Sequence, residues 1–144
     1  MYFEDFELNQ QFAIPPAHIG KSQIKAFARD YDPLPLHLDE EKARETRFGG
    51  LIAPGVMSFM SVWAEFVRLD IINARLVAGL STKIEWFAPV YPGDELSGTA
   101  TITKKEDYSE DSGFMELSIE VHNQEGLLVL KDVTEILMQR RPEP

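Results

Sequence analysis

The sequence contains no cysteine, and this absence excludes several classes of protein. A chain without thiols forms no disulfide framework, no thiolate zinc site and no cysteine nucleophile. Histidine is scarce as well, and His18 and His122 stand at no metal-ligand spacing from another histidine or a carboxylate. The sequence also lacks a phosphate-binding P-loop, a dinucleotide-binding glycine motif and a Gly-x-Ser-x-Gly elbow. We therefore expect no metal and no nucleotide cofactor.

Basic residues are outnumbered, because 14 Lys and Arg stand against 24 Asp and Glu and give a net charge of −10. The densest basic pairs, Lys104-Lys105 and Arg140-Arg141, are too small to form a patch that binds nucleic acid within such a field. The acidic balance is typical of a soluble protein. We expect no nucleic-acid partner.

Long hydrophobic runs are absent. The segment 49–64 carries no charge, but Pro54-Gly55 interrupts it and it falls short of the about 20 apolar residues that a membrane span needs. The first residues have neither a basic start nor an apolar run, so we expect no secretory signal and a cytoplasmic protein. With 144 residues, 44% of them hydrophobic, and no repeat or linker, the chain is expected to form one domain, 1–144.

Three helices are predicted. Apolar residues follow helical spacing from Ser22 to about Tyr31, with Ser22 as a candidate N-cap. Asp39 is expected to cap a short helix from Glu40 to about Thr46. The apolar residues around 52–67 point in almost every direction of a helix, which is typical of a buried one.

The second half of the chain changes to a period of two, which is typical of strands. Four strands are expected, at 76–86, 96–103, 115–121 and about 127–138. Turn residues separate them, as in Pro92-Gly93-Asp94. Long antiparallel strands that follow one apolar helix predict an α+β fold, in which a curved sheet wraps around a central helix.

Asp32 and His37 are the strongest candidates for chemistry. A histidine titrates near neutral pH, and a nearby carboxylate can orient it or share its proton work. Pro33 and Pro35 stiffen the segment between them. An offset of five places the two side chains on opposite faces of a strand and about 140° apart on a helix, so spacing alone does not bring them together. A capping aspartate beside a partly buried histidine is the alternative interpretation.

Two segments carry a resemblance to a known family. Residues 31–39, Tyr-Asp-Pro-Leu-Pro-Leu-His-Leu-Asp, and 48–55, Phe-Gly-Gly-Leu-Ile-Ala-Pro-Gly, resemble the signature of MaoC-like dehydratases, the hydratase-2 group that includes (R)-specific enoyl-CoA hydratases. Residues 87–94 resemble a later strand-to-turn segment of that family. The resemblance implies a hotdog fold, a long central helix wrapped by a curved antiparallel sheet.

By this resemblance Asp32 and His37 would hold a catalytic water, one acting as base toward it and the other handling the proton of the α-carbon. Gly55 fits the position of a backbone donor to the thioester oxygen, because helix N-termini present free N–H groups and a positive dipole end. Ser58 aligns with a hydroxyl that could orient the acid–base pair. A plain helix start at Gly55 and a small packing residue at Ser58 are the alternatives.

Three residues depart from the family pattern. Leu34 stands where relatives usually carry Asn or Gln, Pro54 replaces a small or polar residue, and Ser58 stands where Thr is common. None of these changes removes a proton-transfer group. They leave room for a shifted substrate or a weaker activity.

The resemblance also implies a substrate and a partner. The substrate would be an acyl-CoA or a carrier-protein thioester of the kind found in fatty acid metabolism, with coenzyme A as part of the substrate and no separate cofactor. A homodimer or a higher homo-oligomer is expected. The pattern does not rank the cations available for the CoA phosphates: Arg47, Arg75, Lys83 and Lys104.

Trp63, Phe66 and Trp86 could line an acyl tunnel near the subunit interface, although core packing is the more common role of such residues. A thioesterase of the same fold and a non-catalytic acyl-CoA-binding hotdog protein are the alternative functions.

Overall fold

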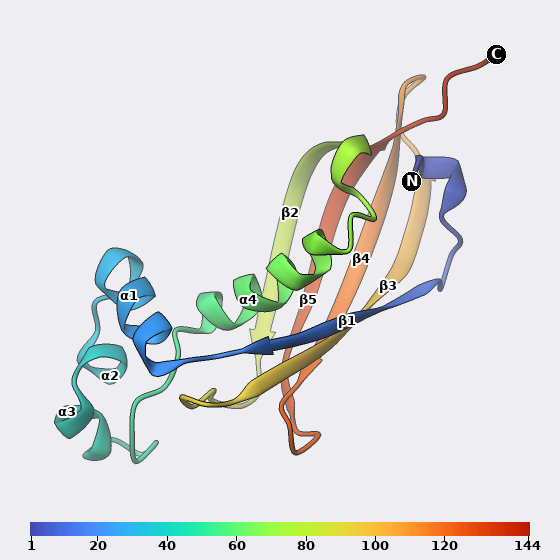
Figure 1. The fold of residues 1–144 in the computed structure, drawn as a ribbon. Coiled ribbons are helices and arrows are strands. Elements are labelled where there is room, and N and C mark those ends of the chain that lie inside the picture. The colour runs from blue at the N-terminus through green and yellow to red at the C-terminus, as the bar shows by residue number, and fades with distance from the viewer.

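The computed structural model describes residues 1–144 as an antiparallel sheet with one long helix across its face (Figure 1). The five strands pair in the order β1-β3-β4-β5-β2. The strands are β1 (Gln11–His18), β2 (Leu76–Trp86), β3 (Glu95–Asp107), β4 (Ser112–His122) and β5 (Leu128–Gln139). The helices are η1 (Phe3–Asp5), α1 (Lys21–Tyr31), α2 (Pro35–Leu38), α3 (Glu40–Arg44), α4 (Gly55–Arg68) and η2 (Asn73–Arg75).

The core lies between α4 and the inner face of the sheet. The predicted alternation of β4 is confirmed, because Met115, Leu117, Ile119 and Val121 are all fully buried. On β3 a side chain at Gly98 would approach the Val62 methyl group of α4 to 3.0 Å. The absence of that side chain lets the helix pack close to the sheet.

Strand β1, which ends at His18, was not predicted. Pro15 and Pro16 argue against a central strand because a proline has no N–H to donate. β1 is an edge strand that pairs only with β3, and its register shifts between Ile14 and Ala17. The edge position and this bulge accommodate the prolines.

The helix boundaries differ in detail from the prediction. Ser22 is not the cap of α1; Gly20 occupies that position, and its N–H donates to the Gln23 Oε1 at 2.9 Å. The Asp39 cap is confirmed, because its carboxylate accepts from the N–H groups of the second and third residues of α3 at 3.0 and 3.1 Å. α3 ends at Arg44, two residues before the expected end.

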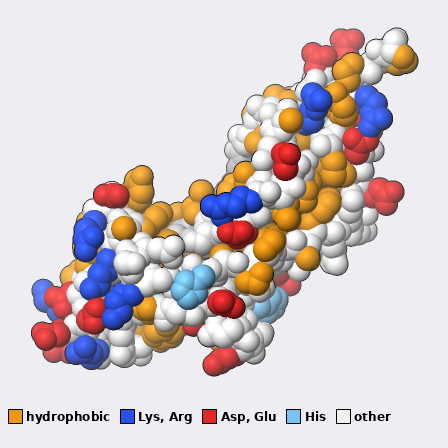
Figure 2. Space-filling model, viewed as in Figure 1, with side chains coloured by type: hydrophobic (Ala, Val, Ile, Leu, Met, Phe, Trp, Pro, Cys, Tyr) orange, Lys and Arg blue, Asp and Glu red, His pale blue; other side chains and the backbone are white.

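The composition of helix α4 suggested that it is buried on all sides, but one face is exposed. Val56 and Met60 on its outer face are 49% and 45% exposed. Strand β2 is a sheet edge whose residues are mostly exposed, Val77 and Leu80 among them, and two register shifts break its period. Figure 2 shows apolar side chains along the region where α4 crosses the sheet. This chain therefore presents an apolar edge and helix face to its surroundings.

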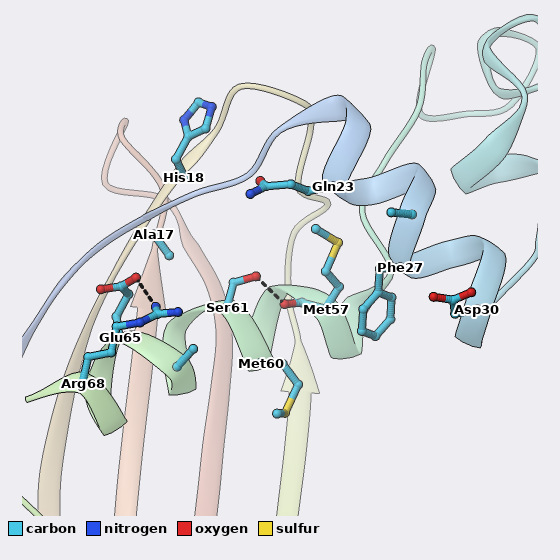
Figure 3. Close-up of a pocket in the computed structure, with 12 residues that line it drawn as sticks. Ala17, His18, Gln23, Phe27, Asp30, Met57, Met60, Ser61, Glu65 and Arg68 are labelled. Atoms are coloured by element: carbon cyan, nitrogen blue, oxygen red, sulfur yellow. Dashed lines mark hydrogen bonds and ion pairs between the residues drawn. The ribbon is translucent and has the colours of Figure 1, made fainter. Parts of the chain in front are cut away.

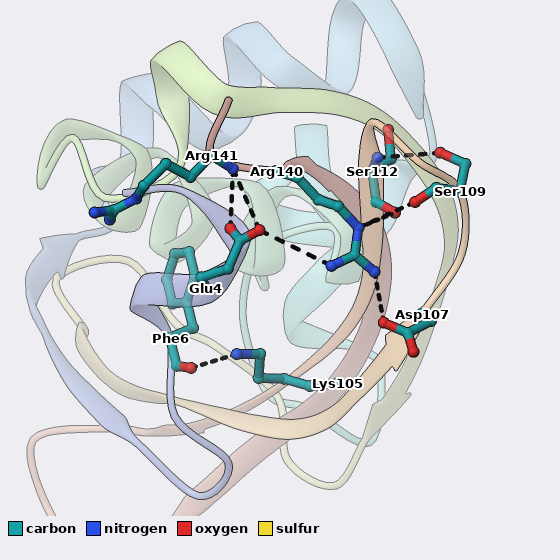
Figure 4. A network of polar contacts seen from close by, with 8 residues as sticks. All are labelled: Glu4, Phe6, Lys105, Asp107, Ser109, Ser112, Arg140 and Arg141. Carbon is teal, nitrogen blue, oxygen red and sulfur yellow. Dashed lines mark hydrogen bonds and ion pairs between the residues drawn. The ribbon is translucent and has the colours of Figure 1, made fainter. Parts of the chain in front are cut away.

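At the end of the molecule opposite α1–α3, a polar network joins the two termini (Figure 4). The Arg140 guanidinium contacts Asp107 at 2.6 Å, and the Arg141 N–H donates to Glu4 at 3.0 Å. Lys105 donates to the carbonyl of Phe6. Residues of both basic pairs, Lys104-Lys105 and Arg140-Arg141, thus bind other groups of the same chain.

No helix in the structure is both long enough and apolar enough to cross a membrane.

Candidate functional site

The structure brings Asp32 and His37 together. α1 ends at Tyr31, and Asp32 leaves the helix in a non-helical conformation (φ −155°, ψ 69°). Pro35 occupies the start of α2, a position that its fixed φ favours, and this single turn aims His37 back toward Asp32. The His37 Nε2 lies 3.3 Å from the Asp32 Oδ2. The histidine is buried and the carboxylate is partly exposed, with 40% of its side-chain surface accessible.

The contact of the second ring nitrogen of His37 indicates which tautomer the imidazole adopts. The His37 Nδ1 lies 2.7 Å from the carbonyl oxygen of Ile52, which can only accept, so Nδ1 carries a hydrogen. In a neutral imidazole the Nε2 lone pair would then face the carboxylate, and two acceptors would meet. The 3.3 Å contact is attractive only with one proton between them, on the imidazole or on the carboxyl.

Backbone hydrogen bonds close the turn between the two residues. The Leu34 N–H donates to the Asp32 carbonyl at 2.7 Å, and the His37 N–H donates to the Leu34 carbonyl at 3.0 Å. The Leu34 side chain is 51% exposed. The chain thus braces this turn with main-chain groups at the position where relatives are expected to carry an amide side chain.

Three of the four predicted site residues line one cavity of about 290 Å³: His37, Gly55 and Ser58. Asp32 does not line it and reaches it through His37. The other walls come from segments 47–53 and 86–90. The Ala53 N–H donates to the Val90 carbonyl at 2.8 Å and ties these two walls together.

Gly55 begins α4 at the edge of this cavity. The preceding Pro54 offers no capping side chain, and the first helical bond runs from the Ser58 N–H to the Pro54 carbonyl at 3.1 Å. The N–H groups of the first turn have no partner within the helix. A side chain at Gly55 would approach the Trp86 ring to 2.6 Å, so glycine is required here for the close approach of the indole.

Ser58 is almost completely buried, and its hydroxyl has no hydrogen-bond partner. A buried hydroxyl without a partner costs about 1–3 kcal/mol, so its presence in a cavity wall favours a polar occupant. The hydroxyl makes no hydrogen bond to Asp32 or His37. Its orienting role stays a prediction.

Arg47 is the only lysine or arginine in the cavity wall. Its guanidinium lies 5.0 Å from the centre of the Phe48 ring and forms no ion pair. The other expected cations do not line the cavity: Lys104 pairs with Glu116, Arg75 covers the ring of Tyr2, and Lys83 is exposed on β2. The sequence named Arg47 as a candidate, but only the structure distinguishes it.

The aromatic residues divide between the cavity and the core. Trp86 lines the cavity, whereas Trp63 and Phe66 do not. The Trp63 ring lies 5.5 Å from that of Phe66 and 6.0 Å from that of Phe59, both buried in the core. Trp63 and Phe66 thus pack in or against the core, and a tunnel role for them at a subunit interface stays a prediction.

A larger groove of about 530 Å³ lies between α1, α4 and β1 (Figure 3). It has an apolar floor of Phe27, Met57 and Met60, and a Glu65–Arg68 ion pair at 2.6 Å spans one side. Asp30, two residues before Asp32, lines this groove and not the cavity of His37. The groove contains no acid–base pair.

Sequence reasoning missed one buried acid, Asp132 on β5. Its side chain is fully buried between Ile84 and Ile119 of the neighbouring strands. One oxygen accepts from the Thr134 hydroxyl at 2.7 Å and the other has no partner. Burial raises the pKa of Asp132 to about 6, against the lowering effect of the Thr134 hydrogen bond.

Nowhere does the structure gather three or more His, Cys, Asp or Glu in a group that could hold a metal ion.

Residues 9–132 match the protein family described as "FAS1-like, dehydratase domain region". Among solved structures, the chain is similar to a MaoC-like dehydratase from Rhodospirillum rubrum, with 31% identity, a TM-score of 0.84 and 99% of each chain covered. It is also similar to a monoamine oxidase regulatory protein from an Archaeoglobus species, with 29% identity, a TM-score of 0.92 and 99% of this chain and 96% of that one covered.

An (R)-hydratase from A. caviae, involved in PHA biosynthesis, shares the fold at 23% identity, with a TM-score of 0.76 and 96% of this chain and 99% of that one covered. These likenesses confirm the predicted α+β hotdog architecture.

Proposed function

Because the chain belongs to the FAS1-like dehydratase domain family, in agreement with its resemblance to MaoC-like dehydratases, we propose that it is a hydro-lyase. The reaction interconverts a trans-2-enoyl thioester and a 3-hydroxyacyl thioester of (R) configuration. The single observation that carries the proposal is the Asp32–His37 pair, whose Nε2 and Oδ2 lie 3.3 Å apart beside a cavity that also contains the start of α4.

The pair supplies both proton transfers of the reaction. In hydration, one member removes a proton from a water molecule as the water oxygen bonds to the β-carbon. The other member delivers a proton to the α-carbon as the carbon–carbon double bond is lost. One proton is taken up and one is given, so the total number of protons on the pair is unchanged. Transfer of a proton from the base to the acid across the 3.3 Å contact restores the starting state. Dehydration is the same sequence in reverse.

Negative charge develops on the thioester oxygen during this step. The free N–H of Gly55, at the positive end of the α4 dipole, is the proposed donor to that oxygen. The unpartnered hydroxyl of Ser58 lies one turn further along α4, in the same wall, and is available to the substrate or the water. Loss of one oxyanion donor costs about 100- to 1,000-fold in rate.

We propose coenzyme A as the acyl carrier, with Arg47 as the residue that meets its phosphates. Arg47 is exposed, free of carboxylate partners and part of the cavity wall. Six basic residues balance six acidic ones over positions 21–50, so the whole net charge of −10 resides in the rest of the chain. Arg47 thus belongs to a segment of this acidic protein that has no net charge and repels an anion least.

A homodimer is the proposed assembly. The β2 edge and the outer face of α4 expose Val56, Met60, Val77 and Leu80. An unpaired, apolar sheet edge is a template for pairing with a second strand. Trp86, in the cavity wall, belongs to the same strand, so a partner bound there would lie beside the site.

A single assay tests this function. The purified protein is mixed with crotonyl-CoA while the enoyl absorbance, free thiol and product chirality are followed. Loss of absorbance without thiol release, with an (R) product, is expected. Thiol release would identify a thioesterase, and no turnover across acyl chain lengths would leave a binding protein.

Two substitutions test the residues. Asp32→Asn and His37→Gln each remove a proton-transfer group and should lower kcat by about 100- to 10,000-fold with little change in thermal unfolding. Wild-type turnover in either variant would refute the mechanism. Asp30→Asn, in the other groove, is the matched control and should retain activity.

A further inference from the structure

Trp86 contacts Gly55 in two ways. The indole Nε1 donates to the Gly55 carbonyl oxygen at 2.9 Å. The face of the ring occupies the space in which a side chain at Gly55 would lie, with ring atoms 2.6 to 3.0 Å from that position. The two residues are 31 positions apart and belong to different elements, the end of β2 and the start of α4.

Together these contacts restrain Gly55 at its carbonyl group and at its Cα. The hydrogen bond fixes the peptide plane that follows the Cα, and the ring limits movement of the Cα itself. The Gly55 N–H belongs to the preceding peptide, whose Pro54 carbonyl accepts from the Ser58 N–H. Glycine is the residue with the most backbone freedom, so a glycine that joins these two peptides at a functional helix start needs a restraint at its Cα to keep the N–H in one direction. No capping side chain supplies it, because Pro54 precedes the helix and offers none.

A second observation marks this point as a ligand-binding position. The Ser58 hydroxyl is 1% exposed, has no partner and lines the same cavity as Gly55 and Trp86. The helix start and this unsatisfied hydroxyl therefore face a common space. Trp86 forms part of its wall although 47% of the residue is exposed, which is unusual for a side chain whose only role is core packing.

We infer that Trp86 is a positioning residue, which holds the first turn of α4 so that the Gly55 N–H meets the thioester oxygen. This inference rests on the proposed hydro-lyase function. The effect on the Gly55 N–H is one of position, because the indole bonds the carbonyl of Gly55, which lies in the following peptide. Trp86 acts on the reaction through Gly55 and does not itself transfer a proton.

The test separates the N–H from the ring. Trp86→Phe keeps an aromatic ring over Gly55 and removes the donor, whereas Trp86→Ala removes both. Trp63→Phe is the matched control, because it makes the same chemical change at the other tryptophan, which does not line the cavity. We expect Trp86→Phe to lower kcat for crotonyl-CoA by about 3- to 10-fold, with KM within about twofold and an unchanged Tm. We expect Trp86→Ala to lower kcat further and to raise KM.

Amide hydrogen exchange gives a readout that does not depend on turnover. In Trp86→Phe the amides of the first hydrogen-bonded turn of α4, beginning with Ser58, should exchange about tenfold faster than in the wild-type protein, while amides in the core strand β4 are unchanged. Wild-type kcat together with wild-type exchange at these amides would overturn the inference. If the wild-type protein has no hydration activity, the proposed function fails, and unchanged exchange in the variant would then reject the restraint as well.

Discussion

The burial of the Asp132 carboxyl lowers the free energy of unfolding by an amount that depends on pH and can be measured. The folded state raises its pKa to about 6 from an ordinary value of 3.8, because the carboxyl is surrounded by the apolar core. The native state therefore binds this proton more tightly than the unfolded state does. The stability gained from this tighter proton binding is fully present below about pH 4 and is lost as pH rises through 6.

The size of the effect follows from the shift. A difference of about 2 pKa units corresponds to about 3 kcal/mol, at about 1.4 kcal/mol per unit. The Asp132→Asn substitution keeps the shape and a partner for the Thr134 hydroxyl but cannot ionise. We expect this variant to be more stable than the wild-type protein by up to about 3 kcal/mol at pH 7.5, and close to it at pH 4.

Urea denaturation at both pH values measures this difference. The other carboxylates are the same in both proteins. The change with pH in the difference between their free energies of unfolding therefore isolates Asp132. Glu110→Gln, an exposed carboxylate on the β3–β4 turn, is the control and should show no such change. A difference in free energy of unfolding that is the same at both pH values would refute the desolvation argument. A variant that is less stable at pH 7.5 would show that the ionised carboxylate has a partner in the folded protein.

Three further predictions concern the carrier, the dimer and the core. Arg47→Gln should raise KM for crotonyl-CoA by about 3- to 5-fold but leave KM for crotonyl-pantetheine, which lacks the phosphates, unchanged. Lys104→Gln is the control, and equal effects of Arg47→Gln on both substrates would reject a phosphate contact. Leu80→Lys should convert a dimer to a monomer in light scattering, and an unchanged mass would exclude β2 as the interface. Gly113→Ala places a methyl group against the Phe3 ring and should lower the free energy of unfolding by about 1–3 kcal/mol; a neutral result in chemical denaturation would contradict the packing.

The parts of the fold that the sequence predicted are those with strong local patterns. The alternation of β4, the cap at Asp39 and the long helix at Gly55 each depend on residues close together in the chain. Strand β1 was missed because Pro15-Pro16 contradicts a strand unless the strand lies at an edge, and edge position is a property of the whole sheet. The exposure of Val56 on α4 was missed for a similar reason, since composition does not show which side of a helix the sheet covers.

By itself, the sequence determined the groups available for chemistry: Asp32 and His37 on a stiff turn, and Gly55 at the start of an apolar helix. Only the tertiary structure decided how they are placed. The Ile52 carbonyl, 15 residues away, fixes which His37 nitrogen carries the hydrogen, and Trp86, 31 residues away, holds Gly55. Such contacts arise when distant segments pack together, and no local periodicity encodes them. The chain thus specifies its reactive groups locally, whereas long-range packing sets their direction and their protons.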